Sequence, residues 1–112
     1  MKLSVLMKKL EYESVVSITE DPDVIYGYTS DLLSDVMGNA EEGSVLITIQ
    51  AHRNSVAVAV QLDFPAIIIC NGRQIPSDME ESARKEGVAL LKTKDNQFTA
   101  SYKVFKALNS GV

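Results

Sequence analysis

The sequence is poor in cysteine, histidine and tryptophan. Its 112 residues include one cysteine, one histidine (His52) and no tryptophan, and Cys70 lies in an apolar run that predicts a buried, unreactive thiol. A single cysteine excludes an internal disulfide, and one cysteine with one histidine cannot form a zinc-type cluster. The chain also lacks an apolar run of the roughly 18 residues that span a membrane, and residues 1–4 do not resemble a signal peptide. We therefore expect a cytoplasmic protein with no metal, no cofactor and no membrane association.

Positive charge is absent from a long part of the chain. Residues 11–51 contain nine acidic residues and no lysine or arginine, whereas from Arg84 onward five lysines accompany only Glu86 and Asp95. The net charge of −4 argues against non-specific binding to nucleic acid, which requires a cationic surface. The split can reflect surfaces that face each other within the fold or between subunits, and solvated surface charge is the ordinary alternative.

Hydrophobic periodicity and turn residues predict strands and helices along most of the chain. Ser77 and Glu80 form a capping box for a helix that Gly87 closes. Ser30 and Asn96 are expected to begin two other helices. The predicted strands are 15–18, 24–26, 45–50, 66–70 and 88–91, and the predicted helices are 3–10, 31–37 (ended by Gly38), 54–62, 77–86 and one that starts at Asn96.

Two of these segments are apolar throughout. Residues 56–60 alternate like a strand, but Asn54 or Ser55 could begin a helix, and we favour a helix over 54–62. Such a helix must be buried on more than one side. Residues 66–70 are typical of a central strand covered on both faces. The final helix carries a single apolar stripe made of Phe98, Tyr102, Phe105 and Leu108.

The order of the predicted elements defines the fold class. From residue 24 onward, strands and helices alternate, which indicates an α/β fold in which most strands run parallel. We expect a single domain over residues 1–112, with a mainly parallel β-sheet of about five or six strands and helices on both faces.

Polar residues follow several of the predicted strands. In open parallel sheets, ligands bind outside the carboxyl ends of the strands, where the N-termini of the following helices add unpaired N–H groups suited to an anion. The ordinary alternative is that these residues are caps and turns, as in every α/β protein, and that His52 is a structural histidine. The candidate ligand-binding residues at this edge are Thr29, Ser30, His52, Arg53, Asn54, Asn71, Arg73 and Thr93.

Several segments resemble the DRTGG domain family. The resemblance is carried by residues 27–38 (GYTSDLLSDVMG), 48–54 (TIQAHRN), 56–59 (VAVA) and 68–73 (IICNGR), and it covers nearly the whole chain. This family is similar to the N-terminal domain of HPr kinase/phosphorylase, here without a kinase domain. Related domains occur within phosphotransacetylases and between CBS modules of regulated pyrophosphatases. The resemblance therefore implies a role in regulation and dimerisation.

The motif that names the family is altered in this chain. Asp21 matches its Asp, but Pro22 replaces the Arg, and Tyr26 replaces the first of two glycines, which leaves Gly27. Loss of the Arg removes a bidentate anion-binding group. Replacement of a glycine by tyrosine removes conformational freedom and fills space. A ligand role of this turn in relatives is therefore not carried over to this chain.

The resemblance to a kinase does not extend to catalytic residues. Phosphoryl transfer needs a phosphate-binding loop, a lysine and a magnesium site. Residues 38–44 have the glycine spacing of a P-loop, but they lack the lysine, contain two glutamates and follow a predicted helix instead of a strand. Asp31 and Asp35, one turn apart on that helix, fit surface or cap roles better than a catalytic or magnesium-binding pair. No nucleophile–histidine–acid arrangement is apparent, and we expect no enzymatic activity.

Two functions remain open. In the first, the domain is a non-catalytic regulatory or ligand-sensing module that binds a phosphate-bearing small molecule, such as an adenine nucleotide, at the carboxyl edge of the strands. In the second, it is a homodimer that docks on a partner protein without a small-molecule ligand, because a second chain can cover one side of the apolar helix at 54–62. The two can coexist when a ligand tunes the contacts between chains.

Overall fold

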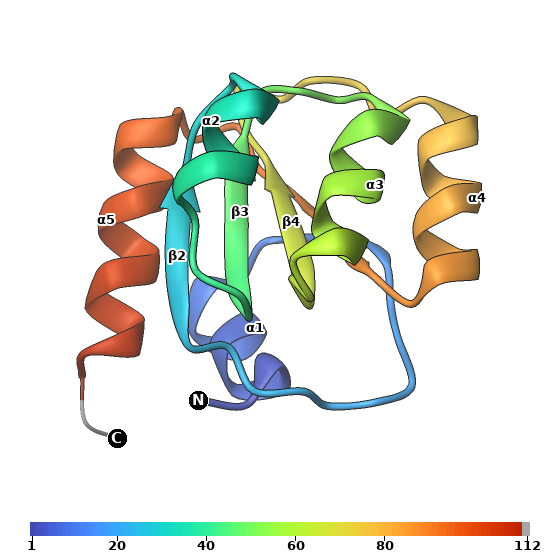
Figure 1. Ribbon diagram of the computed structural model, residues 1–112. Helices are drawn as coiled ribbons and strands as arrows, with labels where there is room; N and C mark the ends of the chain where they lie inside the picture. The colour runs from blue at the N-terminus through green and yellow to red at the C-terminus, as the bar shows by residue number, and fades with distance from the viewer. Residues whose placement is uncertain (111–112) are drawn as a thin grey trace.

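A computed structural model describes residues 1–110 and contains one five-stranded sheet in the order β1-β5-β4-β3-β2 (Figure 1). The three pairs β2–β3, β3–β4 and β4–β5 are parallel, and β1 pairs antiparallel with β5. The expected α/β fold with a mainly parallel sheet is therefore confirmed. The strands are β1 (Glu13–Val16), β2 (Tyr26–Thr29), β3 (Ser44–Thr48), β4 (Ala66–Ile69) and β5 (Ala89–Lys92).

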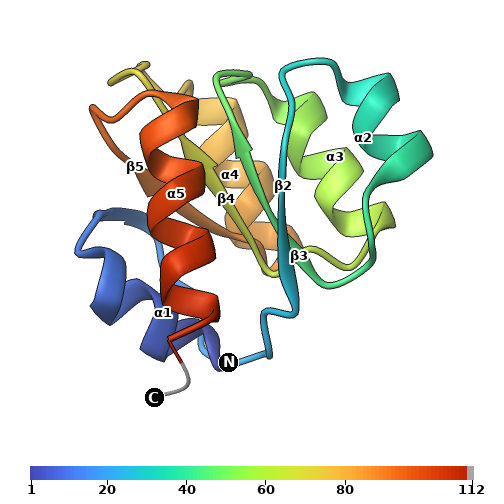
Figure 2. The same ribbon diagram turned by 90° about the vertical axis from the view of Figure 1, so that its left-hand side faces the viewer.

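Helices cover both faces of the sheet, as the sequence predicts (Figures 1 and 2). Side chains of α1 and α5 share one buried cluster with alternate residues of β3, β4 and β5. Side chains of α2, α3 and α4 share a second cluster with the remaining residues of these strands. The helices are α1 (Leu3–Leu10), α2 (Leu33–Asn39), α3 (Arg53–Gln61), α4 (Ser77–Glu86) and α5 (Gln97–Leu108). Within residues 1–110, none of them is long and apolar enough to span a bilayer.

The central strand β4 joins the two clusters. Ile67 and Ile69 point into the α2–α3–α4 cluster, whereas Ile68 points into the α1–α5 cluster, and all three are fully buried. Each buried isoleucine contributes about 1.5–3 kcal/mol of transfer free energy relative to an exposed one. The prediction of a central strand covered on both faces is confirmed.

The second strand is displaced from its predicted position at 24–26. Val24 is buried, but its N–H donates to the carbonyl of Met1 at 2.7 Å. Asp23 forms an isolated antiparallel bridge with Lys2. Because this part of the chain is bound to the N-terminus, pairing with β3 starts only at Tyr26.

Two predicted helix caps are wrong, although α4 has the predicted bounds. The Ser30 hydroxyl accepts a hydrogen bond from the Leu32 N–H, so it closes a short turn, and α2 begins at Leu33. Gly38 lies inside α2 and does not end it. Ser77 is the first residue of α4, and Pro76 occupies the N-cap position without a side-chain cap, so the capping box is not formed. Gly87 does end α4, with a φ of 73° that favours glycine.

The predicted helix at 54–62 is confirmed by α3. Val56, Val58 and Ala59 are buried against the rest of the fold, whereas Val60 is 40% exposed and lies on the outer side with Ala57. The helix is therefore covered on most of its circumference.

The final helix starts where the sequence predicts and presents an unexpected face. Asn96 caps α5 by accepting a hydrogen bond from the Thr99 N–H at 2.9 Å. The face that packs on the sheet carries Ala100, Val104 and Ala107, whereas three aromatic side chains of the predicted apolar stripe point outward. Small residues face the sheet because α5 lies close to it: a Cβ added to Gly27 would be 3.3 Å from Val104 Cγ1. The outward-pointing side chains are Phe98, Tyr102 and Phe105, with exposed fractions of 83%, 59% and 57%.

The observed caps predict a difference between two alanine substitutions. Asn96→Ala removes a side-chain cap and is expected to lower the free energy of unfolding by about 1 kcal/mol. Ser77→Ala removes no cap and is expected to change it by less than about 0.5 kcal/mol. Urea denaturation of both variants measures the difference, and an equal loss in both would show that Ser77 does cap α4.

Candidate functional site

The structure places all eight predicted site residues at the carboxyl edge of the parallel strands. Thr29 and Ser30 end β2, and residues 52–54 begin α3 after β3. Asn71 and Arg73 follow β4, and Thr93 follows β5. Four neighbouring connections therefore meet at one edge of the sheet, as a parallel arrangement requires.

Side chains from β2 and the start of α3 are engaged in local hydrogen bonds. The Thr29 hydroxyl is hydrogen-bonded to that of Ser101 on α5. The Nδ1 atom of His52 accepts a hydrogen bond from the Asn54 N–H at 3.0 Å, which makes His52 the N-cap of α3. Ser55 is buried, and its hydroxyl donates to the carbonyl of Gln50 at 2.8 Å. These contacts shape the turns and leave only the Nε2 side of the His52 ring for another partner.

The loops after β4 and β5 are joined to each other by backbone hydrogen bonds. Asn71 and Gly72 both have positive φ values, of 63° and 61°. The Asn71 N–H donates to the carbonyl of Asp95, and the Gly72 N–H donates to that of Thr93, both at 2.9 Å. The Thr93 hydroxyl accepts from the Asp95 N–H at 3.0 Å. These amides already have partners, so a ligand at this edge must be held mainly by side chains.

Asp95 connects this pair of loops to helix α5 and to the segment between α1 and β1. Its carboxylate accepts hydrogen bonds from the Tyr12 hydroxyl at 2.8 Å and from the Lys103 ammonium at 2.7 Å. The Lys103 ammonium also lies 5.6 Å from the centre of the Tyr12 ring. The hydrogen bond from Lys103, followed by that from Tyr12, lowers the pKa of Asp95, whereas burial and the nearby carboxylate raise the pKa of Tyr12.

Cys70 directly follows β4. Its thiol is fully buried, and burial, followed by the charge of Asp95, raises its pKa to about 11. A buried thiol with so little thiolate is a poor nucleophile at neutral pH, which agrees with the unreactive cysteine expected from the sequence.

Several polar side chains of the edge are exposed. Arg53, Asn54 and Arg73 are exposed. Among residues 1–110, the ion pairs join Lys2 to Asp23, Arg84 to Glu80 and Lys103 to Asp95, so neither guanidinium group of the edge is paired. Arg53 and Arg73 lie on the connections that leave β3 and β4, which are adjacent strands.

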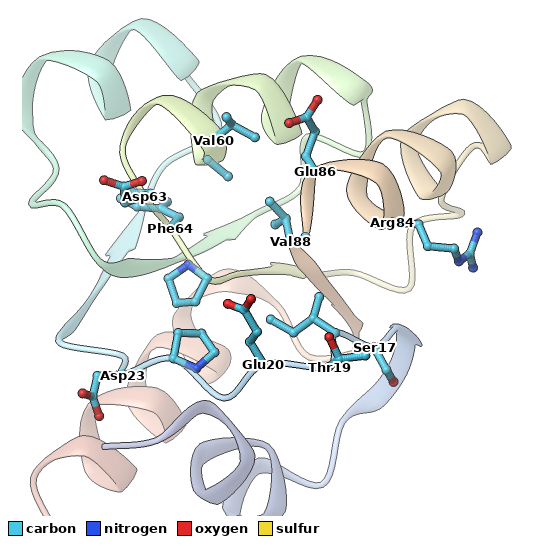
Figure 3. A pocket seen from close by; sticks show the side chains of 15 residues that line it. Ser17, Thr19, Glu20, Asp23, Val60, Asp63, Phe64, Arg84, Glu86 and Val88 are labelled. Atoms are coloured by element: carbon cyan, nitrogen blue, oxygen red, sulfur yellow. The ribbon is translucent and has the colours of Figure 1, made fainter.

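A cavity lies at the opposite end of the sheet (Figure 3). It has a volume of about 640 Å³ and is formed by residues 17–23 together with the segments that precede β4 and β5. Its charged lining consists of Glu20, Asp23, Asp63 and Glu86, with Arg84 as the single cation. Figure 3 shows the Arg84 side chain directed away from the centre of this group. The sequence contained no motif for this cavity; its acid-rich turn was the only local signal.

The two aspartates near α2 have different environments. Asp31 precedes the helix, so it is not one turn from Asp35 on a common helix face. The Asp35 carboxylate accepts hydrogen bonds from the Tyr28 hydroxyl and from Asn39, both at 2.9 Å. The hydrogen bond from Tyr28 is the main cause of the lowered pKa of Asp35. Across residues 1–110, His, Cys, Asp and Glu side chains form no group of three that could hold a metal ion.

Comparison with known proteins identifies the family. Residues 36–108 match the family described as HPr Serine kinase N terminus, which is about two thirds of the chain. The chain is an α/β domain with a mainly parallel sheet, and it belongs to this family. The altered motif around Asp21 and Tyr26 lies outside the matched residues. No curated protein matches the chain.

A solved structure shares the fold. It is the crystal structure of the CBS and DRTGG domains of the regulatory region of Clostridium perfringens pyrophosphatase, complexed with its activator diadenosine tetraphosphate. The sequence identity is 21%, the TM-score is 0.65, and the alignment covers 95% of this chain and 46% of the other. The chain therefore spans less than half of that polypeptide. Together with the family match, this structure confirms the resemblance to the DRTGG domain.

The contacts of Asp95 predict a pH-dependent contribution to stability. Asp95→Asn weakens both hydrogen bonds to the carboxylate and is expected to lower the free energy of unfolding by about 1–2 kcal/mol at neutral pH. Because the pKa of Asp95 is lowered in the folded state, this contribution is present above the ordinary aspartate pKa and is lost as the pH falls through the lowered value.

Chemical denaturation between neutral and acidic pH measures this contribution. The difference between wild type and Asp95→Asn should shrink as the pH falls. Asp31→Asn serves as the control, because no hydrogen bond to the Asp31 carboxylate is present within residues 1–110. A difference that stays constant down to the acid transition would contradict a charged role for Asp95.

Proposed function

We propose that this chain is a non-catalytic regulatory module that binds a phosphate-bearing small molecule, such as an adenine nucleotide, at the carboxyl edge of β3 and β4. The observation that carries the proposal is the pair of exposed, unpaired guanidinium groups of Arg53 and Arg73 on adjacent connections. Guanidinium groups bind phosphate oxygens in a bidentate manner. The N-terminus of α3, where Arg53 is the first residue, adds a favourable dipole.

The distribution of charge favours this edge over the acidic cavity. Four carboxylates line the cavity, and its one arginine is 3.9 Å from Glu80, so a phosphate would meet net negative charge there. At the carboxyl edge, the nearby Asp95 is already neutralised by Lys103 at 2.7 Å. A phosphate approaching Arg53 and Arg73 therefore meets a locally cationic surface.

The remaining edge residues fit accessory roles. Asn54, at the start of α3, is exposed and offers an amide, and the Nε2 side of His52 is available for a hydrogen bond to a base or phosphate. Ser30, Asn71 and Thr93 use their hydroxyl or backbone groups in the turns, and thus serve to hold the edge in shape.

The family and the structural neighbour support a regulatory role without catalysis. The pyrophosphatase region that shares the fold is regulatory, and it was crystallised with a nucleotide activator. In this chain, the P-loop-like segment at 38–44 connects helix α2 to strand β3, the reverse of the order that a phosphate-binding loop requires.

Thermal unfolding with ATP, AMP or inorganic phosphate tests the ligand proposal. A ligand present at about 100 times its Kd adds about 2.7 kcal/mol to the free energy of unfolding, which raises the Tm of a domain of this size by roughly 10 °C. Arg53→Ala or Arg73→Ala removes a charge-assisted hydrogen bond and is expected to weaken binding at least about tenfold.

Arg84→Ala is the matched control, since it removes an exposed arginine from the acidic cavity. It should leave the Tm shift unchanged. The proposal is wrong if none of these ligands raises the Tm, or if Arg84→Ala abolishes binding while the two edge variants retain it.

A second function, a dimeric interaction module, is favoured by an apolar surface different from the one the sequence indicated. The sequence placed this surface on the helix at 54–62, but α3 is mostly covered by the rest of the fold. The exposed aromatic side chains lie on α5.

A further inference from the structure

The uneven distribution of charge along the sequence has a counterpart on the surface of the fold. Residues 11–51 contain no lysine or arginine, whereas helices α1 and α5, near the two ends of the chain, contain four lysines and no acidic residue. Helix α1 packs against α5 on one face of the sheet (Figure 2). The fold therefore brings cationic side chains from both ends of the sequence together.

A groove between α1 and α5 collects three of these lysines. It has a volume of about 520 Å³, and its lining includes Lys9, Lys103 and Lys106. Glu11 is the one carboxylate among its lining residues. The groove therefore has a positively charged lining, although the chain as a whole has a net charge of −4.

Two of the three ammonium groups have no carboxylate partner among residues 1–110. The Lys103 ammonium is already ion-paired at 2.7 Å. Lys9 donates to the Ser110 hydroxyl at 3.2 Å, and the Lys106 ammonium lies 6.0 Å from the centre of the Tyr102 ring. A hydroxyl and an aromatic ring are uncharged, so the charges of Lys9 and Lys106 stay available for an anion.

An uncharged groove lies on the other side of the same helix. It lies between β2 and α5, has a volume of about 370 Å³, and has no charged residue in its lining. Phe98 and Phe105 line it and are 83% and 57% exposed. Tyr102, which is 59% exposed, lines both grooves. The cationic side and the aromatic side of α5 thus meet at Tyr102, and together with Lys9 they are here called the α5 surface.

The small number of unpaired charges indicates the class of partner. Proteins that bind nucleic acid commonly contact about 6–10 phosphates, which is far more than two ammonium groups can neutralise. Both groups belong to lysines, which bind as point charges, whereas bidentate recognition of phosphate favours arginine. A protein segment with a few carboxylates matches this number and kind of charge.

The aromatic side of α5 adds a second requirement. Aromatic residues, and tyrosine in particular, are enriched where proteins bind each other. A segment that carries both carboxylates and large apolar side chains satisfies the two sides of α5 at once. Its carboxylates can pair with Lys9 and Lys106 while its apolar side chains cover Tyr102 and Phe105, as amphipathic segments do when they bind grooves on a helical surface.

We propose that the α5 surface binds an acidic, amphipathic segment of a partner protein. This inference gives a class of partner to the second function proposed above, and it does not require a dimer. It is independent of ligand binding at the carboxyl edge, because neither Arg53 nor Arg73 lines the two grooves.

Fluorescence anisotropy with a labelled peptide tests the proposal. The probe is a synthetic peptide of about 15 residues, with glutamates on one side of a helix and leucine and phenylalanine on the other. The full chain should bind it with a Kd below about 100 μM at about 0.1 M NaCl. At about 1 M NaCl, where the screening length falls from about 10 Å to about 3 Å, the Kd should rise at least about tenfold.

Charge reversal separates the α5 surface from the rest of the protein. Lys106→Glu replaces an attraction by a repulsion and should raise the Kd at least about tenfold. Lys85→Glu is the matched control, because it makes the same change of net charge at an exposed lysine of α4, on the opposite face of the sheet. It should leave the Kd within about twofold of the wild type, since the site lies beyond the screening length. Both lysines are exposed, so both variants should keep the circular dichroism of the wild type.

Tyr102→Ser examines the aromatic side of the surface. It removes a large uncharged contact and should weaken binding at least about tenfold at low and high salt alike, because screening does not act on an apolar contact. A Tyr102→Ser variant that binds the peptide as tightly as the wild type would contradict the part of the proposal that concerns apolar side chains.

Four other outcomes would overturn the proposal. The first is the absence of peptide binding at a protein concentration of about 1 mM. The second is an equal loss of binding in Lys106→Glu and Lys85→Glu, which would indicate attraction by charge alone. The third is tighter binding of a thymidine oligonucleotide of about 15 nucleotides, lost in Lys106→Glu, which would assign the surface to nucleic acid. The fourth is a wild-type dimer in sedimentation that Lys106→Glu dissociates, which would assign the surface to a second copy.

The same measurements distinguish this proposal from the two proposed functions. The peptide titrations contain no nucleotide, so they do not depend on the carboxyl edge. A dimer that does not bind the peptide and is unaffected by Lys106→Glu would overturn this inference and leave the second function intact.

Discussion

Strand β4 carries three consecutive isoleucines that are fully buried on alternate faces of the sheet. A parallel sheet with such a centre is stable only when helices cover both faces, and the chain must cross over after each strand to provide them. This requirement fixes the positions of the other elements. It brings the connections after β2, β3, β4 and β5 to one edge, and it leaves two outer strands whose backbones have one free side.

At this polar edge, hydrogen bonds fix the backbone of the loops, and only a few side chains have no partner within residues 1–110. Backbone hydrogen bonds from Asn71 and Gly72 join the loop after β4 to the loop after β5, and Asp95 binds this pair of loops to Tyr12 and to Lys103 of α5. The backbone amides and hydroxyls of these turns already form hydrogen bonds with each other. The exposed arginines are therefore the main groups that can bind an anion. The cavity at the other end of the sheet is lined by four carboxylates and one arginine, so it carries the opposite charge.

The close packing of α5 explains why its aromatic residues face outward. Ala100, Val104 and Ala107 lie against the sheet. The helix is so close to β2 that a Cβ at Gly27 would lie 3.3 Å from Val104 Cγ1. Bulky side chains on α5 can be accommodated only on the outer face. The same contact that completes the core on this side of the sheet therefore creates an exposed aromatic surface next to an open strand edge.

The sequence by itself determined the alternation of strands and helices, the central position of residues 66–69, the cap at Asn96 and the family resemblance. These features depend on local patterns, because an apolar run, a capping side chain and a short family-like segment each involve only a few neighbouring residues. The position of the eight candidate residues at the carboxyl edge also followed from the sequence, because parallel strands end at the same edge of the sheet. Whether that edge binds a ligand is a separate question that the proposed binding measurements address.

Only the tertiary structure decided the start of β2, the caps of α2 and α4, the outward face of α5 and the place of the acidic cavity. Val24 is hydrogen-bonded to Met1 at the N-terminus. Helix α5 has apolar side chains on two faces, and the face with the smaller side chains packs against the sheet. Such outcomes depend on contacts between residues far apart in the chain, and periodicity alone does not specify which apolar face is buried.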